Sequence, residues 1–133
     1  MLKSVNLRDH MLLHPVKVKS DDNLLEAMQI IISNKISGVC VVDAEENLVG
    51  VLSELDCLRG ALSAIYNESG IGIVGEYMAS ENLVVAHPDE DIIDVAQDML
   101  LKKMRRRPVV EDGKLVGQIT CRTLLNAVKN FRS

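Results

Sequence analysis

Apolar residues follow two different periods along the chain, and the same succession of periods occurs twice. In the first half, an extended segment at 14–18 precedes apolar residues spaced three and four apart from about Asp22, which is the period of a helix. Two nearly continuous apolar runs around a polar turn follow, and they predict strands covered on both faces. A second helical pattern closes the half. The predicted order is strand, helix, strand, strand, helix.

The second half predicts the same elements in the same order. Its extended segment is 81–86, and its first helix is expected to start near Pro88 and Asp89 and to carry Lys102 and Lys103 in its last turn. The apolar positions expected on one face of the two leading helices are Leu24, Leu25, Met28, Ile31, Ile32 and Ile92, Ile93, Ala96, Met99, Leu100. In the two closing helices they are Leu55, Leu58, Leu62, Ile65 and Leu124, Leu125, Val128, Phe131.

The halves share residues as well as periods. The triplet Leu-Val-Gly at 48–50 recurs at 115–117, and Val-Val at 41–42 recurs at 109–110, one position out of step. A turn that is one residue longer in the first half explains the slip. Further upstream we align 9–11 with 76–78 and 16–18 with 83–85.

This repetition predicts an α+β fold made of a tandem, pseudo-twofold pair of β-α-β-β-α motifs. The first motif is assigned to residues 1–66 and the second to 76–133. Between them, residues 67–75 contain three glycines, which disfavour a regular element, so this segment is predicted to be a linker.

The phrase at each strand-to-helix junction resembles a known family motif, G-h-h-[S/T]-x-x-D, which GVLSELD at 50–56 matches throughout. From about residue 5 to residue 131 the chain is similar to a CBS-domain pair, or Bateman module. The resemblance implies two small α+β units with clefts between them, which commonly form homodimers. It also implies a regulatory ligand, an adenine nucleotide (AMP, ADP or ATP) or S-adenosylmethionine. We therefore expect a sensor that transmits ligand occupancy to an unidentified partner protein.

Elementary chemistry supports a nucleotide at the first junction. A helix N-terminus offers unpaired N–H groups and the positive end of the helix dipole to phosphate, and the Ser53 hydroxyl adds a donor. Asp56, one turn later, can accept hydrogen bonds from both hydroxyls of a ribose. The resemblance places the adenine ring against the backbone of the first two strands, near Val16, Val18, Ser37 and Val39.

A purely structural interpretation of the same phrase remains open. Ser53 and Asp56 are also spaced as a capping box, which stabilises a helix by about 1 kcal/mol and requires no ligand. The two roles are compatible, and the duplicated architecture favours the nucleotide site.

The second junction keeps only part of this chemistry. Thr120 retains the hydroxyl, but Thr123 stands where the first copy has Asp56. The second site is thus expected to be empty, weaker, or suited to a ligand without a free diol. Arg105, the counterpart of Ser37, is expected to contact phosphate; Arg106 and Arg107 are weaker candidates, since charge runs are usually solvated.

Composition argues against other classes of function. The net charge is −4 and only three residues are aromatic, which disfavours nucleic-acid binding. No apolar run approaches the roughly 20 residues that span a bilayer, and no export signal is visible. Three widely spaced cysteines without a CxxC pair predict reduced core thiols and a cytoplasmic location.

Two competing functions stay open. The chain can be a ligand-independent dimerisation or protein-interaction module with vestigial clefts, as Thr123 and the lack of proline at Cys40 suggest, or a redox-responsive module using Cys57. Catalysis is not expected, because no nucleophile–base arrangement is recognisable. Nor is a metal or a cofactor expected: His10 and His14 are four apart but no further ligands complete a site, and His87 is interpreted as a residue at a helix start.

Overall fold

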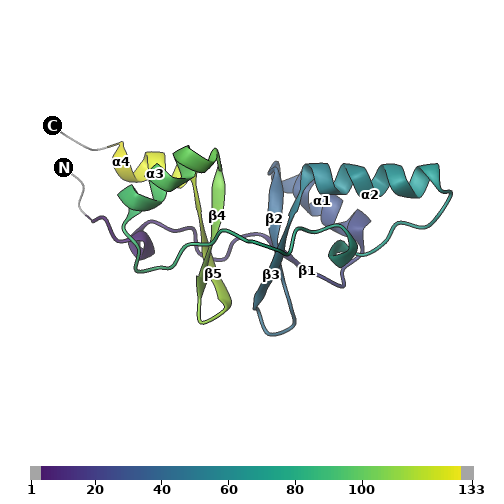
Figure 1. The fold of residues 1–133 in the computed structure, drawn as a ribbon, viewed down its shortest axis with the longest axis horizontal. Coiled ribbons are helices and arrows are strands. Elements are labelled where there is room, and N and C mark those ends of the chain that lie inside the picture. The colour runs from purple at the N-terminus through teal and green to yellow at the C-terminus, as the bar shows by residue number, and fades with distance from the viewer. Residues whose placement is uncertain (1–3, 130–133) are drawn as a thin grey trace. The chain divides into compact units, whose positions relative to one another are not determined.

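The computed structural model describes residues 4–129, which form two compact units. The first unit is Val16–Leu83, and the second consists of residues 4–15 together with 84–129. Each unit packs helices on a small sheet, so the predicted α+β class is confirmed for both (Figure 1).

The first unit contains a three-stranded sheet in the order β1-β2-β3, with β1 parallel and β3 antiparallel to the central strand. Every residue of the central strand is buried, as its continuous apolar run predicts. The elements are β1 (Lys17–Lys19), α1 (Leu24–Asn34), β2 (Gly38–Val42), β3 (Leu48–Ser53), α2 (Glu54–Tyr66) and the 3-10 helix η2 (Val74–Glu76).

The second unit repeats this plan with a two-stranded antiparallel sheet. Its elements are the 3-10 helix η1 (Leu7–Asp9), α3 (Ile92–Lys102), β4 (Arg106–Glu111), β5 (Lys114–Thr120) and α4 (Cys121–Val128). Phe131, expected on the last helix, lies outside the described residues.

The compact units cut across the sequence motifs, because each motif lends a short segment to the other unit. The η1 segment packs in the second unit, where the Leu7 N–H donates to the Glu90 carbonyl at 2.9 Å. Equivalently, η2 packs in the first unit, where the Val74 N–H donates to the Asp22 carbonyl at 2.9 Å. Leu7 and Val74 are both fully buried. The stretch 67–75, predicted to be an irregular linker, therefore ends inside a 3-10 helix that is part of a core.

The extended segment predicted at 81–86 does not form a strand. Ala86 makes a single parallel bridge to Val109, and the pairing stops there. The next N–H group, that of His87, donates to the Glu90 carboxylate at 2.7 Å, and Pro88 has no N–H to offer. The chain thus turns away from the sheet directly after the bridge.

The bridge also corrects the alignment of the repeats. Val18 pairs with Val41, and Ala86 pairs with Val109. Since Val41 and Val109 are equivalent, Val18 corresponds to Ala86, and residues 16–18 align with 84–86 rather than with 83–85.

Both leading helices begin later than the sequence suggested, because the side chain directly before each helix caps it. Asn23 accepts from the Leu25 N–H at 2.8 Å and Asp91 from the Ile93 N–H at 2.7 Å. Pro88 therefore lies in the preceding turn and not at the first helical position. At the other end, Lys103 adopts a left-handed conformation and closes α3.

The apolar face predicted for α2 is exposed. Leu55 and Ile65 are 75% and 73% accessible, whereas Cys57 and Gly60 face the core. Any side chain at Gly60 would collide with Leu24, so the helix packs through its small residues. Four of the ten residues on the predicted face of the leading helices are exposed as well: Leu25, Ile32, Ile93 and Leu100.

Gly50 and Gly117 allow a close approach to the sheets by the exchanged segments, which are the segments that each motif lends to the other unit and which contain Ala79 and Leu12. A Cβ at Gly50 would lie 2.8 Å from the Ala79 carbonyl oxygen, and one at Gly117 would lie 2.9 Å from the Leu12 carbonyl oxygen. These segments are bridged to the sheets beside each glycine, at Val51–Ala79 and Leu12–Gln118. The repeated glycine is thus required by the chain's own backbone.

We predict that Gly50→Ala and Gly117→Ala each lower the free energy of unfolding by about 1–3 kcal/mol, because backbone atoms cannot move aside as a flexible side chain can. Urea denaturation measures the change. Gly70→Ala is the control, because nothing lies within 4 Å of a Cβ at that position. Equal stability of the three variants would show that the close approach carries no cost.

Candidate functional site

The junction between β3 and α2 forms a complete capping box. The Ser53 hydroxyl accepts from the Asp56 N–H at 3.1 Å, and Asp56 Oδ2 accepts from the Ser53 N–H at 2.9 Å. The structural role that the sequence left open is therefore present.

Asp56 nevertheless keeps acceptor capacity. Its other oxygen, Oδ1, accepts from Arg59 Nη1 at 3.2 Å, and its side chain is 17% accessible. A carboxylate has about four lone-pair sites, so one further hydrogen bond can be made to each oxygen. This arrangement suits two neighbouring hydroxyl groups.

The residues predicted to contact adenine on the first two strands differ in whether their side chains are accessible to a ligand. Ser37 is exposed and lies beside the junction, since its carbonyl accepts from the Glu54 N–H at 2.9 Å. Val18 and Val39 belong to the hydrophobic core, and Val16 packs partly against it. Their side chains are thus occupied by the core, and a ligand at these positions would meet mainly backbone.

The β5–α4 junction has a capping box without a charge. The Thr120 hydroxyl accepts from the Thr123 N–H at 3.1 Å, and Thr123 Oγ1 accepts from the Thr120 N–H at 2.7 Å. The Thr123 hydroxyl therefore completes the capping box in place of a carboxylate. Because it is uncharged, it cannot bind the two hydroxyls of a diol as a carboxylate can.

Arg105 occupies the position in the second unit that Ser37 occupies in the first. Its carbonyl accepts from the Cys121 N–H at 3.0 Å, just as that of Ser37 accepts from Glu54. Arg105 is exposed beside Thr120 at the start of α4. Six of the predicted residues thus belong to the first unit, and Arg105 and Thr120 belong to the second.

Arg107 is neither a solvated residue nor an exposed phosphate contact. It is only 3% accessible, and its Nη2 donates to Asp98 Oδ2 at 2.7 Å. Hydrogen bonds from Lys102 and from Arg107 lower the pKa of Asp98. Sequence reasoning missed this ion pair, because Asp98 and Arg107 lie on different elements.

The three cysteines fall into two classes. Cys40 and Cys57 are buried, as predicted, but Cys121 is exposed at the first position of α4, so its assignment to the core was wrong. Burial raises the pKa of the Cys57 thiol, and the charges of Asp56 and Glu54 raise it further. A less acidic thiol is a poor basis for redox sensing.

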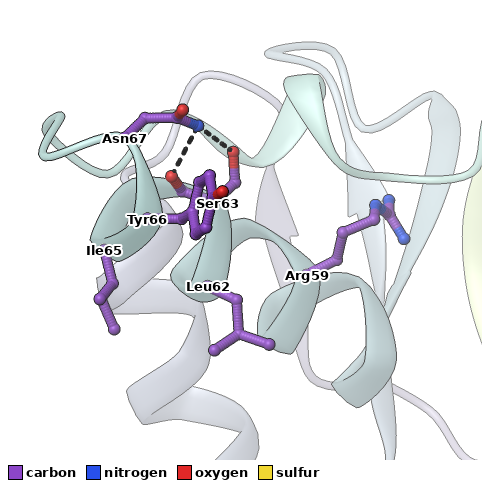
Figure 2. Close-up of a pocket in the computed structure, with 6 residues that line it drawn as sticks. All are labelled: Arg59, Leu62, Ser63, Ile65, Tyr66 and Asn67. Carbon is purple, nitrogen blue, oxygen red and sulfur yellow. Dashed lines mark hydrogen bonds between the residues drawn. The ribbon is translucent and has the colours of Figure 1, made fainter.

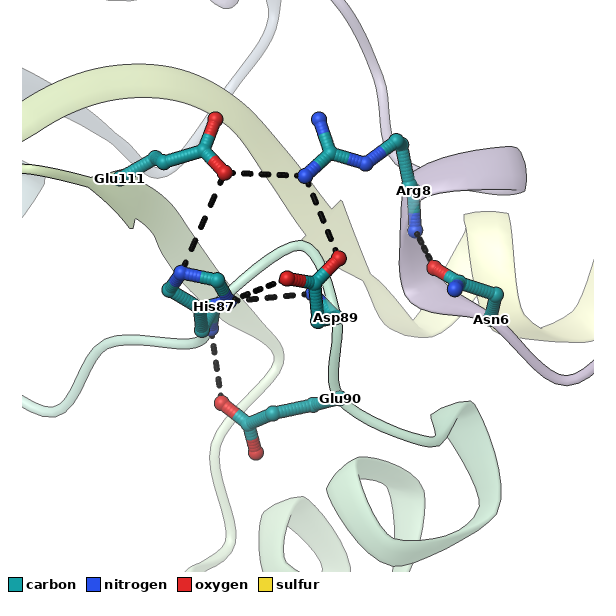
Figure 3. Close-up of polar contacts among 6 residues, drawn as sticks. All are labelled: Asn6, Arg8, His87, Asp89, Glu90 and Glu111. Carbon is teal, nitrogen blue, oxygen red and sulfur yellow. Dashed lines mark hydrogen bonds and ion pairs between the residues drawn. The ribbon is translucent and has the colours of Figure 1, made fainter.

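His87, Asp89 and Glu111 converge in the second unit, within 4.8 Å of one another (Figure 3). These residue types can bind a metal, but the Arg8 guanidinium already contacts Asp89 at 3.3 Å and Glu111 at 2.9 Å. His87 Nδ1 accepts from the Asp89 N–H at 3.1 Å, which uses its lone pair. We assign the cluster to fastening η1 to this unit.

Apolar grooves lie between the helices of each unit. In the first unit a groove of about 170 Å³ between α1 and α2 is lined by Met28, Ile31, Ile32, Glu54, Cys57 and Leu58. In the second, the groove between α3 and α4 is about 260 Å³. Farther along α2, Leu62, Ile65 and Tyr66 border another hollow (Figure 2). Among the described residues no helix is both long and apolar enough to cross a bilayer.

The chain belongs to the CBS domain family, whose model matches residues 7–63 and 74–130. The chain is similar to CBSX2 from Arabidopsis thaliana, solved in complex with AMP, at 30% identity and a TM-score of 0.81, covering 95% of this chain and 97% of that one. The CBS domain pair of protein MJ0100, in complex with 5′-methylthioadenosine and S-adenosylmethionine, is 26% identical with a TM-score of 0.72, covering 95% of this chain and 94% of that one.

Similarity extends to part of a larger protein. Inosine-5′-monophosphate dehydrogenase from Aquifex aeolicus is 37% identical over 121 residues, which are 90% of this chain but 24% of the dehydrogenase. The chain thus spans about a quarter of that relative's length.

We predict that native Cys121 is alkylated at least tenfold faster than Cys57 at pH 7, since Cys121 is exposed and the raised pKa of Cys57 leaves it less thiolate. Because the pKa of Cys57 is raised, its rate should continue to rise with pH after that of an ordinary thiol has levelled off. Iodoacetamide labelling followed by peptide mass spectrometry measures both rates, with urea-unfolded protein as the control. Equal rates in the folded protein would contradict the prediction.

Proposed function

We propose that this chain is a non-catalytic regulatory module whose first unit binds an adenosyl ligand: AMP, ADP, ATP or S-adenosylmethionine. The observation that carries the proposal is Asp56, held by its capping box with one acceptor position left on each oxygen. Complexes of CBSX2 with AMP and of MJ0100 with S-adenosylmethionine support the choice of ligand class.

The residues divide the ligand by chemistry. Asp56 accepts from the ribose hydroxyls, while Ser53 and the N-terminus of α2 bind phosphate. Adenine packs against backbone at Val16, Val18, Ser37 and Val39. In the second unit, Arg105 and Thr120 are proposed to contact phosphate at that unit's own junction, which has no carboxylate. Occupancy then favours one conformation of the module and so changes its affinity for a regulated protein. The cytoplasmic location and the existence of a regulated partner protein are predictions from the sequence.

We expect Asp56→Asn to weaken binding roughly tenfold to a hundredfold, because hydrogen bonds to a charged acceptor contribute about 1.5–3 kcal/mol. Asparagine keeps an acceptor for the Ser53 N–H, so the helix stays capped. Calorimetric titration with the four ligands measures the loss. Glu54→Gln, which removes the same charge from the same helical turn, is the matched control. If folded wild-type protein bound none of the four ligands, the proposal would be refuted.

We also propose that the module is a homodimer formed through its helices. Leu55, Leu58, Leu62 and Ile65 are spaced three, four and three apart on the exposed side of α2, which is the spacing of a helix–helix seam. Figure 2 shows Leu62 and Ile65 projecting from the same side of the helix. The apolar groove between α1 and α2 extends this surface, and a second copy would remove it from water.

Leu62→Glu is expected to shift the protein from dimer to monomer, since a charge in the seam must be desolvated. Sedimentation velocity measures the change, and circular dichroism checks folding. Leu13→Glu changes another exposed leucine, outside the helices, and should leave the dimer intact. A wild-type monomer, or a dimer insensitive to Leu62→Glu, would exclude this interface. This assembly is also what the alternative function, a ligand-independent interaction module, requires.

A further inference from the structure

Arg59 lies one turn after Asp56 on α2 and is held at three points. Its Nη1 donates to Asp56 Oδ1 at 3.2 Å, and its Nη2 donates to the Tyr77 carbonyl at 3.0 Å. Its guanidinium carbon also lies 6.0 Å from the centre of the Tyr77 ring. Arg59 borders the same hollow along α2 as Leu62 and Ile65, and its side chain extends away from those two (Figure 2). An arginine that is 59% accessible is thereby kept in one place.

This contact determines how the Asp56 carboxylate is oriented. The Ser53 N–H binds one oxygen and Arg59 binds the other, so rotation about the last bond of the side chain would break both hydrogen bonds. The two acceptor positions that remain lie one on each oxygen. Two vicinal hydroxyl groups need this arrangement, whereas a single hydroxyl does not.

The second unit lacks the whole set of interacting residues. Thr123 stands at the position of Asp56, Asn126 at that of Arg59, and His10 at that of Tyr77. His10 instead contacts the Ser4 carbonyl through its ring at 2.8 Å. In the described part of the second unit, no guanidinium therefore orients the residue at the position of Asp56.

We propose that Arg59, fixed by Tyr77, is a positioning residue that holds Asp56 for a vicinal diol and so makes the first unit selective for ribonucleotides over 2′-deoxyribonucleotides. The proposal rests on the proposed function, since it concerns the same site. Arg59 acts through Asp56 and need not touch the ligand.

The test compares AMP with 2′-deoxy-AMP by calorimetry. Wild-type protein is expected to prefer AMP roughly tenfold or more, since the deoxynucleotide loses one hydrogen bond to a charged acceptor. In Arg59→Met the affinity for AMP should fall while that for 2′-deoxy-AMP stays nearly unchanged, so that the preference drops to about threefold or less. A purely structural loss would weaken both nucleotides equally and leave the ratio intact.

Two further variants sharpen the result. Arg59→Lys can donate to Asp56 but cannot bridge to Tyr77 at the same time, so an intermediate preference is expected; it also provides a test if Arg59→Met fails to fold. Arg122→Met removes a cation from α4 and should leave the ratio unchanged. An undiminished ratio in both Arg59 variants, or tighter AMP binding by Arg59→Met, would overturn the proposal while leaving the proposed function in place. Failure of wild-type protein to bind AMP would overturn both.

Discussion

The structure depends on the close approach of two exchanged segments to the sheets, which requires glycine at positions 50 and 117. Without a Cβ there, the Ala79 and Leu12 backbones reach hydrogen-bonding distance of β3 and β5. That contact places Leu7 and Val74 in the cores. It also fixes the ends of the strands from which α2 and α4 begin, so the same glycines lie a few residues before both helix N-termini.

Much of the fold could be predicted from the sequence because its determinants are local. Capping residues, buried strands and the repeated Val-Gly phrase are recognisable without tertiary information. The late starts of α1 and α3 come from caps at Asn23 and Asp91 that are themselves local, whereas the other errors have non-local causes. The Leu55–Ile65 stripe has the period of a core face, yet α2 packs through Gly60, and periodicity alone does not tell which face of a helix is buried. Ala86 fails to continue a strand because Glu90 takes the next N–H, which only the folded turn reveals.

The candidate site also combines local determinants, which the sequence reveals, with non-local ones, which it does not. The sequence identified Ser53 and Asp56, and their mutual hydrogen bonds follow from helix geometry alone. Arg59 was not singled out from the sequence, although its spacing from Asp56 on one helix is a local signal. Only the contact that fixes Arg59 is non-local, because Tyr77 comes from the segment after the helix. Helix capping and ligand binding are not competing explanations for the S-x-x-D phrase. The cap and Arg59 each use one of the carboxylate's roughly four acceptor positions and leave one on each oxygen.

The exchange of segments has a consequence for how such a chain can be divided. A cut between the sequence repeats leaves each half with a segment whose packing partners are on the other half. A single repeat expressed alone would expose the pocket that receives the missing Leu7 or Val74. It would then need a second copy of itself to fill that pocket. The exchange thus ties the core of each unit to a segment from the other repeat.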